Sequence, residues 1–489
     1  MRKMMVACVV AATVAAATWA AGAADVKSDP AAPVAAPVGS AAPAGGAVKM
    51  VDQVSQYGIT WTFDKAYPVG QYVTGDFWVV GPVTVKNVDP APTAGRNGSA
   101  VNPKAGTGQP YDDRTPCYDG KLQAAFPLQL GPGQSLVSVA SQDKIGARTA
   151  DIVPGDAPLC PLRTAVVLTC VDQPQAAEAF RPAYVGDKKA TWTTKQLRRD
   201  LLPRLALPAG AKLPDRQSAE RILQRIWLDH LAEHMNREMH PRENMPGYGR
   251  ELTTTISTVG LMLLVDDPKG ENEQVLLHFV QLGIDYWGVV QSDNDLWRAN
   301  GGHNSGRKWP ILFAGLMLGD EGMQQVKAAF AEDQQTYYGQ GYRGQTALWR
   351  INPSLQHEEL PPAEWKGPKF KGENNGQKSE SYRDVNGPTW VGQALAARLM
   401  GAKKLWDHEA YFDYVDRWVK EGSEGSASDQ TKPSAGYKAF SSGFFRAMWE
   451  TYRPKADQIG EETAKKRGGA TGGAEKKAEP AGTDPPAAK

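Results

Sequence analysis

Three polar segments that contain glycine recur in the second half of this chain, and each leads directly into an apolar segment with helical spacing. They span residues 247–251, 300–308 and 381–387. The first two helical segments contain the string Gly-Leu-Met-Leu and the third contains Ala-Arg-Leu-Met, each before another helical segment begins. Helical hairpins that stack side by side bring equivalent loops to the same end of the stack. We therefore predict that these three loops form one site.

Hydrophobic residues recur at helical spacing throughout residues 192–453, for example at Ile222 and Ile226. A linear solenoid would repeat more regularly and would contain few connections as long as residues 335–385. The sequence therefore predicts an all-α domain over residues 192–453 that is folded as a closed α/α toroid of helical hairpins.

Residues 50–173 show a different pattern, because short β-favouring runs alternate with Gly, Pro, Asn and Asp. This spacing predicts a β-sandwich-like domain, so the whole chain is predicted to be a multidomain α+β protein. Aromatic residues in these runs alternate as core residues of strands do, although they would also suit a sugar-stacking platform. These residues are Trp61, Phe63, Tyr72, Phe77 and Trp78.

The two ends of the chain have compositions that do not build a core. Residues 1–24 have the charged start, apolar middle and small-residue exit of a secretory signal peptide, with an uncleaved membrane anchor as the alternative. Residues 25–49 are predicted to be an Ala/Pro-rich linker, and residues 454–489 a disordered, low-complexity tail. We therefore expect a secreted or periplasmic protein without stable membrane insertion after signal cleavage; tethering at the cell surface is an alternative.

Charge, cysteine content and missing motifs argue against several classes of function. The 55 basic and 54 acidic residues leave no electrostatic footprint for nucleic acid. Cys117, Cys160 and Cys170 remain after signal removal, so at most one disulfide forms, and we predict that it joins Cys117 to Cys160 or Cys170. The absence of a GxxxxGKS phosphate loop and of a GxSxG nucleophile elbow argues against ATP and serine-hydrolase chemistry.

His303 is the most informative single residue of the three loops. Its glycine neighbours allow the backbone to approach a ligand, and the pKa of imidazole suits both proton donation and proton acceptance. Arg307 would add positive charge for an anionic substrate. The alternative is a turn in which His303 and Asn304 only satisfy nearby backbone groups.

Two tyrosine–arginine pairs could face the histidine loop, namely Tyr382 with Arg383 and Tyr248 with Arg250. A nearby guanidinium favours the phenolate form of a tyrosine, which can then accept a proton, while arginine and asparagine neutralise a carboxylate. The alternative is that the tyrosine rings pack in the core and the arginines cap helices.

With these hairpins, the loop 300–309 and the segment 382–418, the helical half resembles the α/α-toroid polysaccharide lyases, in particular family 38, which contains alginate and glucuronan lyases. The resemblance implies β-elimination on an acidic polysaccharide, with neither a cofactor nor a metal. It implies catalytic and substrate-binding roles for residues of the matching types. The catalytic set is Tyr382, His303 and Tyr248, and the substrate-binding set is Asn304, Arg307, Arg250 and Arg383.

Two alternatives remain open from the sequence. A glycoside hydrolase on the same scaffold would use two carboxylates, for which Glu251, Asp293 and Asp384 are among the candidates. A noncatalytic protein that binds carbohydrate or a cell surface would suit the tether and the aromatic β region. Finally, His230 and His234 lie four residues apart, as metal ligands on one helix face do, but no third ligand is evident, so no metal site is predicted.

Overall fold

The computed structural model describes residues 48–106, 108–145, 160–231, 239–247, 249–360, 380–423 and 439–469, which belong to one compact unit (Ala42–Lys489). The predicted signal peptide lies outside these residues, as does the predicted linker up to residue 47. The last residue of that linker, Lys49, already belongs to the first strand.

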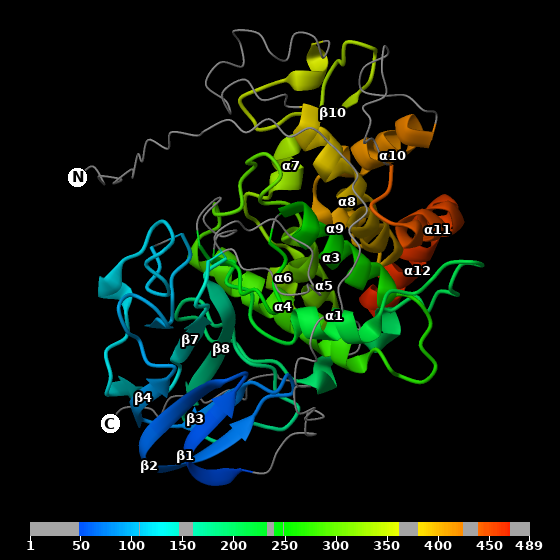
Figure 1. Cartoon of the computed structure of the whole chain (residues 1–489). Coiled ribbons are helices and arrows are strands. Elements are labelled where there is room, and N and C mark those ends of the chain that lie inside the picture. Colours follow the sequence, from blue (N-terminus) through cyan, green and yellow to red (C-terminus); the bar gives the residue numbers. More distant parts are fainter. Residues whose placement is uncertain are drawn as a thin grey trace, which may run out of the picture. The chain divides into compact units, whose positions relative to one another are not determined.

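Residues 49–171 contain one sheet of eight strands, which Figure 1 shows in blue to green. Its order is β5-β7-β8-β3-β2-β4-β6, with β1 paired to β2, and all pairs are antiparallel except β3 with β8. The strands are β1 (Lys49–Gln56), β2 (Ile59–Gln71), β3 (Phe77–Val80), β4 (Val83–Asp89), β5 (Ser99–Val101), β6 (Leu128–Leu130), β7 (Ser135–Ser141) and β8 (Leu162–Val171).

This sheet curves around a core of its own. The indole Nε1 of Trp61 on β2 donates a hydrogen bond of 3.0 Å to Ser138 Oγ on β7, although these strands are not neighbours in the sheet. The predicted β region is therefore confirmed, but its strands are joined in one sheet rather than in two. Trp61, Phe63, Tyr72 and Trp78 are buried, so these four rings pack in the interior and are not available as a sugar platform.

Strands β7 and β8 are buried on both faces, which joins the sheet to the helices. Successive side chains of a strand point to opposite faces. On β7, Leu136 and Ala140 pack in the core of the sheet, whereas Val137 and Val139 pack in the larger core shared with the helices. The sheet therefore packs against the helices and shares a core with them, so it is not an independent module.

Helices follow the sheet, as predicted for a mixed α+β chain (Figure 1). A small antiparallel hairpin, β9 (Thr336–Tyr338) with β10 (Ala347–Trp349), interrupts them. The helices are α1 (Arg216–Leu223), α3 (Gly249–Met262), α4 (Glu273–Ser292), α5 (Lys308–Leu318), α6 (Glu321–Gln324), α7 (Ala331–Gln335), α8 (Glu380–Leu399), α9 (Lys403–Trp406), α10 (Glu409–Ser423), α11 (Gly443–Tyr452) and α12 (Ala456–Gly469); short 3-10 turns are η1 (Gly120–Leu122), η2 (Thr194–Gln196), η3 (Arg199–Leu201), η4 (His357–Glu359) and η8 (Arg453–Lys455).

Helix α5 lies at the centre of the helical part, because all of its residues are buried. Helix α4 packs along α5, and α3 packs along α8. The apolar strings noted in the sequence, such as residues 315–318, therefore belong to the core.

Helix α12 corrects the predicted boundary of the C-terminal tail, because it lies within the segment 454–489. Its backbone packs directly on the end of α8: a Cβ on Gly460 would overlap the carbonyl oxygen of Arg398. Ala456 is buried, and the guanidinium of Arg398 bonds Asp457 at 2.8 Å. The Lys/Glu-rich composition of this segment does not reveal these contacts with α8. The helix that they hold extends to residue 469.

The predicted disulfide is wrong in this structure, since no disulfide joins Cys117 to Cys160 or to Cys170. Cys170 is buried in β8, with its Sγ 3.4 Å from Leu130 O, whereas Cys117 is exposed.

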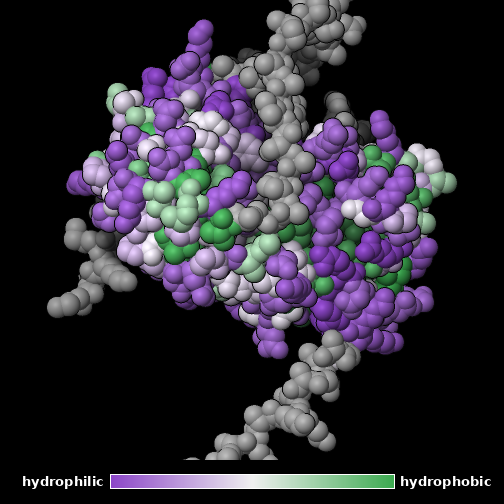
Figure 2. Space-filling view, turned by 90° about the horizontal axis from the view of Figure 1, so that it is seen from below, coloured by the Kyte–Doolittle hydropathy of each residue, from purple (hydrophilic) through white to green (hydrophobic). Residues whose placement is uncertain are grey.

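The surface is largely polar on the face that Figure 2 shows, with small hydrophobic areas between the hydrophilic ones. Large hydrophobic side chains that are exposed are few in the described residues. They are Val48, Met50, Tyr118, Leu122, Ile145, Leu207 and Tyr338. Of these, only Tyr338 belongs to the hairpin beside α10.

Candidate functional site

The three predicted polar segments converge, but only residues 300–307 form a loop, because residues 249–251 are the first turn of α3 and residues 381–387 lie in α8. Gly249, the first residue of α3, lies against the second loop so closely that a Cβ there would overlap the carbonyl oxygens of Gly302 and His303. Gly301 has a φ of +56°, and a Cβ on it would lie 2.8 Å from Cε1 of Tyr382, the third residue of α8. Tyr382 and His303 are therefore neighbours around one short stretch of backbone.

Three of the predicted site residues reach the surface at this point. His303 and Tyr382 are partly exposed, and Arg250 is exposed with an ion pair of 2.5 Å to Glu251. Tyr248, the alternative catalytic tyrosine, lies outside the described residues. The segments that meet here thus carry an imidazole, a phenol and a guanidinium that are each at least partly exposed.

Arg307 does not face a substrate, which corrects its predicted role. The side chain is 1% exposed and makes a two-pronged ion pair with Asp229, with N–O distances of 2.7 and 3.0 Å. Its Nη1 also donates to the carbonyl oxygens of His303 and Ser305, at 2.7 and 2.8 Å. Arg307 therefore holds the His303 loop from below.

Asn304 and Arg383 are also buried, so their predicted substrate contacts are wrong in this structure. The amide of Asn304 donates to Arg298 O at 2.8 Å. The guanidinium of Arg383 bonds Glu358 at 3.0 Å and Glu421 at 2.7 Å. Consecutive helical residues point about 100° apart, so of the pair Tyr382–Arg383 only the tyrosine turns toward the loop.

A polar cluster that the sequence analysis missed lies under the loop. It consists of Glu332 and Gln335 on α7 and of Asn386 and Gln393 on α8, all with 0% exposure. We call these four residues the sub-loop cluster. Gly301 O accepts hydrogen bonds from Gln335 Nε2 at 2.7 Å and from Asn386 Nδ2 at 3.0 Å. The cluster thereby fixes the backbone of Gly301, against which the ring of Tyr382 packs and which leads to His303 two residues later.

Glu332 is the ionisable member of this cluster. Its Oε1 accepts from Gly306 N and from Gln393 Nε2, both at 3.2 Å, while its buried Oε2 has no hydrogen-bond partner. Burial, reinforced by nearby Asp333, raises the pKa of Glu332 to about 7. In the sequence, this cluster is indicated only by the polar run that begins at Glu332. In a helix, Glu332 and Gln335 lie on the same face because they are three residues apart.

The site also has an electrostatic bias from the backbone. Helices α3, α5 and α8 all begin at the His303 loop. Gly249, the first residue of α3, contacts the loop, and α5 begins at Lys308, where the loop ends. Tyr382, in the first turn of α8, packs on the loop. Unpaired N–H groups give a helix N-terminus about half a positive charge, which favours anions. Three such ends favour a carboxylate at this point, whereas the charge of Arg250 is already paired with Glu251.

The described residues include no group of three or more His, Cys, Asp or Glu side chains that could hold a metal ion. His230 is buried, and burial lowers its pKa to about 3, so its ring is neutral and hydrogen-bonds the Tyr184 hydroxyl at 3.2 Å. His234 lies outside the described residues.

Comparisons with known proteins leave the family open: no family model, no curated protein and no solved structure matches the chain. Within the described ranges, none of the helices combines the length and apolarity that crossing a membrane requires.

Proposed function

We propose that this protein is a polysaccharide lyase that cleaves a uronic-acid polymer by β-elimination. The observation that carries the proposal is the contact between the His303 loop and Tyr382, which brings two proton-transfer groups to the point where three helices begin. A uronate substrate would supply the carboxylate that this positively polarised face favours.

The proposed reaction follows from that arrangement. The helix N-termini, with Arg250 exchanging its pair with Glu251 for the substrate, neutralise the substrate carboxylate, which makes the adjacent C5 proton acidic enough to remove. Tyr382 accepts the C5 proton, the C4–O bond breaks, and a C4=C5 double bond forms. In this step Tyr382 acts as a phenolate and becomes a phenol, while His303 acts as an imidazolium, donates its proton to the departing oxygen and becomes neutral, so that charge and atoms balance. Tyr248 is the alternative base.

The proposal includes an α/α toroid and a secreted or periplasmic location. Two observations support a toroid. Helices α3, α5 and α8 begin at one place, and α4 packs along α5 as an outer helix would. Export is supported by the composition of residues 1–24.

A product assay tests the proposal. The protein is incubated with alginate, glucuronan and other acidic glycans, and we expect new ultraviolet absorbance from an unsaturated sugar. Reducing ends without that absorbance would instead indicate a glycoside hydrolase, and binding without turnover a noncatalytic protein. Either result would overturn the lyase proposal.

Two substitutions locate the chemistry. We expect Tyr382→Phe and His303→Ala each to lower turnover by roughly a hundredfold or more, as loss of a proton-transfer group does. Tyr118→Phe, which alters an exposed tyrosine on another part of the chain, is the matched control. Circular dichroism confirms that each variant is folded. Full activity in both site variants would move the active site elsewhere.

A further inference from the structure

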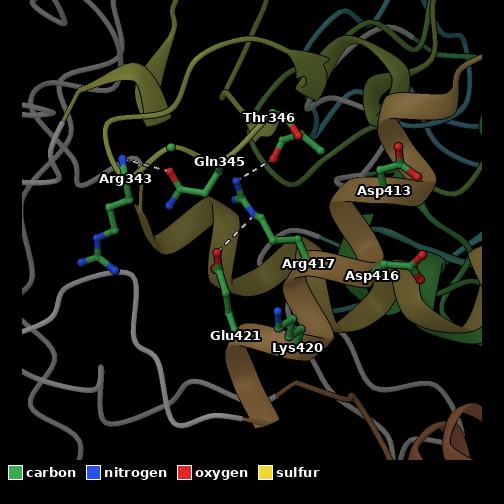
Figure 3. Close-up of a pocket in the computed structure, with 10 residues that line it drawn as sticks. Arg343, Gln345, Thr346, Asp413, Asp416, Arg417, Lys420 and Glu421 are labelled. Atoms are coloured by element: carbon green, nitrogen blue, oxygen red, sulfur yellow. Dashed lines mark hydrogen bonds and ion pairs between the residues drawn. The ribbon is translucent and has the colours of Figure 1, made fainter.

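A polar groove lies between the β9–β10 hairpin and α10, with a volume of about 580 Å³ (Figure 3). This size falls within the range of small-molecule sites, roughly 300–1,000 Å³. One wall is the hairpin loop, residues 343–347. The other is one face of α10, formed by residues at helical spacing: Asp413, Asp416, Arg417, Lys420 and Glu421.

Several charges in this groove are already neutralised. Arg417 bonds Glu358 at 2.5 Å and Glu421 at 3.2 Å. Asp416 accepts from Arg398 at 2.9 Å and from Arg453 at 2.6 Å. These ion pairs fix the walls of the groove; of its carboxylates only Asp413 lacks a cationic partner in the described residues, and it accepts from the Tyr338 hydroxyl.

Two cations are not neutralised in this way. Lys420 is exposed and forms neither a hydrogen bond nor an ion pair in the described part of the chain. The Arg343 guanidinium lies 5.1 Å from the centroid of the Tyr342 ring and pairs with no carboxylate among the described residues. Figure 3 shows both side chains at the groove, with the amide of Gln345 between its walls.

An exposed aromatic ring stands at the rim. Tyr338 is 54% exposed, and its hydroxyl donates to Asp413 Oδ2 at 2.6 Å, which fixes the ring beside the groove. A fixed aromatic face offers the apolar side of a sugar ring a large contact at small entropic cost. Cations for a carboxylate and an aromatic face together match a uronate residue.

Two short connections through the protein link the walls of the groove to the candidate site. Gln335, which holds Gly301 O, is three residues before Tyr338, or about 10 Å of extended strand. Arg383, the neighbour of Tyr382, bonds Glu421 in the groove wall.

The hairpin loop also excludes one alternative ligand. Gly339, Gly341 and Gly344 have the GxGxxG spacing of dinucleotide-binding loops. That motif works by joining a strand to the N-terminus of a helix. Here the loop joins two antiparallel strands, so it has no helix end for a pyrophosphate.

We propose that this groove is a second subsite, which binds a uronate residue of the polymer some distance from the bond that is cleaved. The inference rests on the proposed lyase function for the identity of the polymer. Lys420 and Arg343 hold the carboxylate, and Tyr338 stacks against the sugar ring.

Chain-length dependence tests the subsite. Turnover of a trisaccharide and a heptasaccharide from alginate or glucuronan is compared in the wild type, in the double variant Lys420→Ala/Arg343→Ala and in Tyr338→Ala. In the wild type we expect the longer substrate to have the lower KM. The double variant should reduce this advantage roughly tenfold through KM rather than kcat. Lys404→Ala, at an exposed lysine on α9, is the control and should retain the advantage.

Binding measurements separate failure of the subsite from failure of the lyase. Calorimetry with the heptasaccharide requires no turnover. Weaker binding in the groove variants, with no cleavage by the wild type, would support the subsite and overturn the lyase. Cleavage with the same chain-length dependence in all variants would overturn the subsite and leave the lyase intact. Neither binding nor cleavage would overturn both.

Discussion

Two buried polar clusters in this protein are built differently. At the junction between sheet and helices, the Arg181 guanidinium bonds Asp76 at 2.8 Å and both oxygens of Asp285 at 2.9 and 2.6 Å. The side chain of Gln281 bonds both the N–H and the carbonyl of Arg181. Every charge at this junction has a geometrically good partner.

The sub-loop cluster is incompletely paired. Glu332 Oε2, Asn386 Oδ1 and Gln393 Oε1 are buried without hydrogen-bond partners. A buried acceptor without a partner costs about 1–3 kcal/mol, so its presence needs an explanation. An unpaired buried group can reflect strain or a functional role, and two members of this cluster hold the Gly301 carbonyl directly under the candidate site. The comparison therefore assigns stability to the Arg181 junction and positioning of the His303 loop to the sub-loop cluster.

Removing the charge at the junction should have the largest effect on stability. We expect Arg181→Ala to lower the free energy of unfolding by about 3–5 kcal/mol, because two buried carboxylates lose their counter-charge. Urea denaturation followed by circular dichroism measures the change. Arg216→Ala, which breaks an exposed pair with Glu220 at 4.0 Å, is the control and should cost less than about 1 kcal/mol. Equal losses in the two variants would remove the junction from the stability argument.

Glu332→Gln should have a smaller effect that depends on pH. The folded-state pKa of Glu332, about 7, exceeds its ordinary value of 4.5, so the folded protein holds this proton more tightly than the unfolded chain. Its contribution to stability is complete below pH 4.5 and is lost as pH rises through 7, a loss of roughly 3 kcal/mol. Glutamine does not titrate, so the variant should lack this loss.

The measurement compares the free energy of unfolding of wild type and variant at pH 5 and pH 8. Glu450→Gln, at an exposed position of α11, is the control and should retain the pH dependence of the wild type. The same dependence in Glu332→Gln as in the wild type would show that the buried carboxyl is not the titrating group.

Local patterns in the sequence were sufficient for the coarse fold. Period-two runs predicted the strands, and helical spacing predicted the region that holds α3, α5 and α8. The curvature of the sheet was not predictable, because it depends on contacts such as Trp61 to Ser138, 77 residues apart. The order in α12 depends equally on contacts with Arg398, on another helix.

At the site, the sequence predicted which backbone segments meet but not which side chains face outward. His303, Tyr382 and Arg250 reach the surface, whereas Arg307 and Arg383 turn inward to Asp229 and Glu358. Residue type does not show whether an arginine is exposed or buried, since any arginine can pair either with a substrate anion or with a carboxylate of the protein. The distant carboxylate partner decides, and no local spacing reveals it.

Gly301→Ala should have the smallest effect on stability, and it tests whether the position of the Tyr382 ring over the loop matters for turnover. Alanine at the positive φ of Gly301 costs about 1 kcal/mol in backbone strain, and its Cβ, 2.8 Å from Tyr382 Cε1, displaces the ring. Gly210→Ala is the matched control, because Gly210 has a φ of +75° and nothing within 4 Å of the added Cβ. We expect similar losses of stability in both variants, within about 1 kcal/mol, but a loss of turnover on the uronate substrate only in Gly301→Ala, of roughly tenfold. Equal turnover in the two variants would mean that the position of Tyr382 over Gly301 is irrelevant to the chemistry, and the contrast between a stabilising junction and a positioning cluster would then lose its functional half.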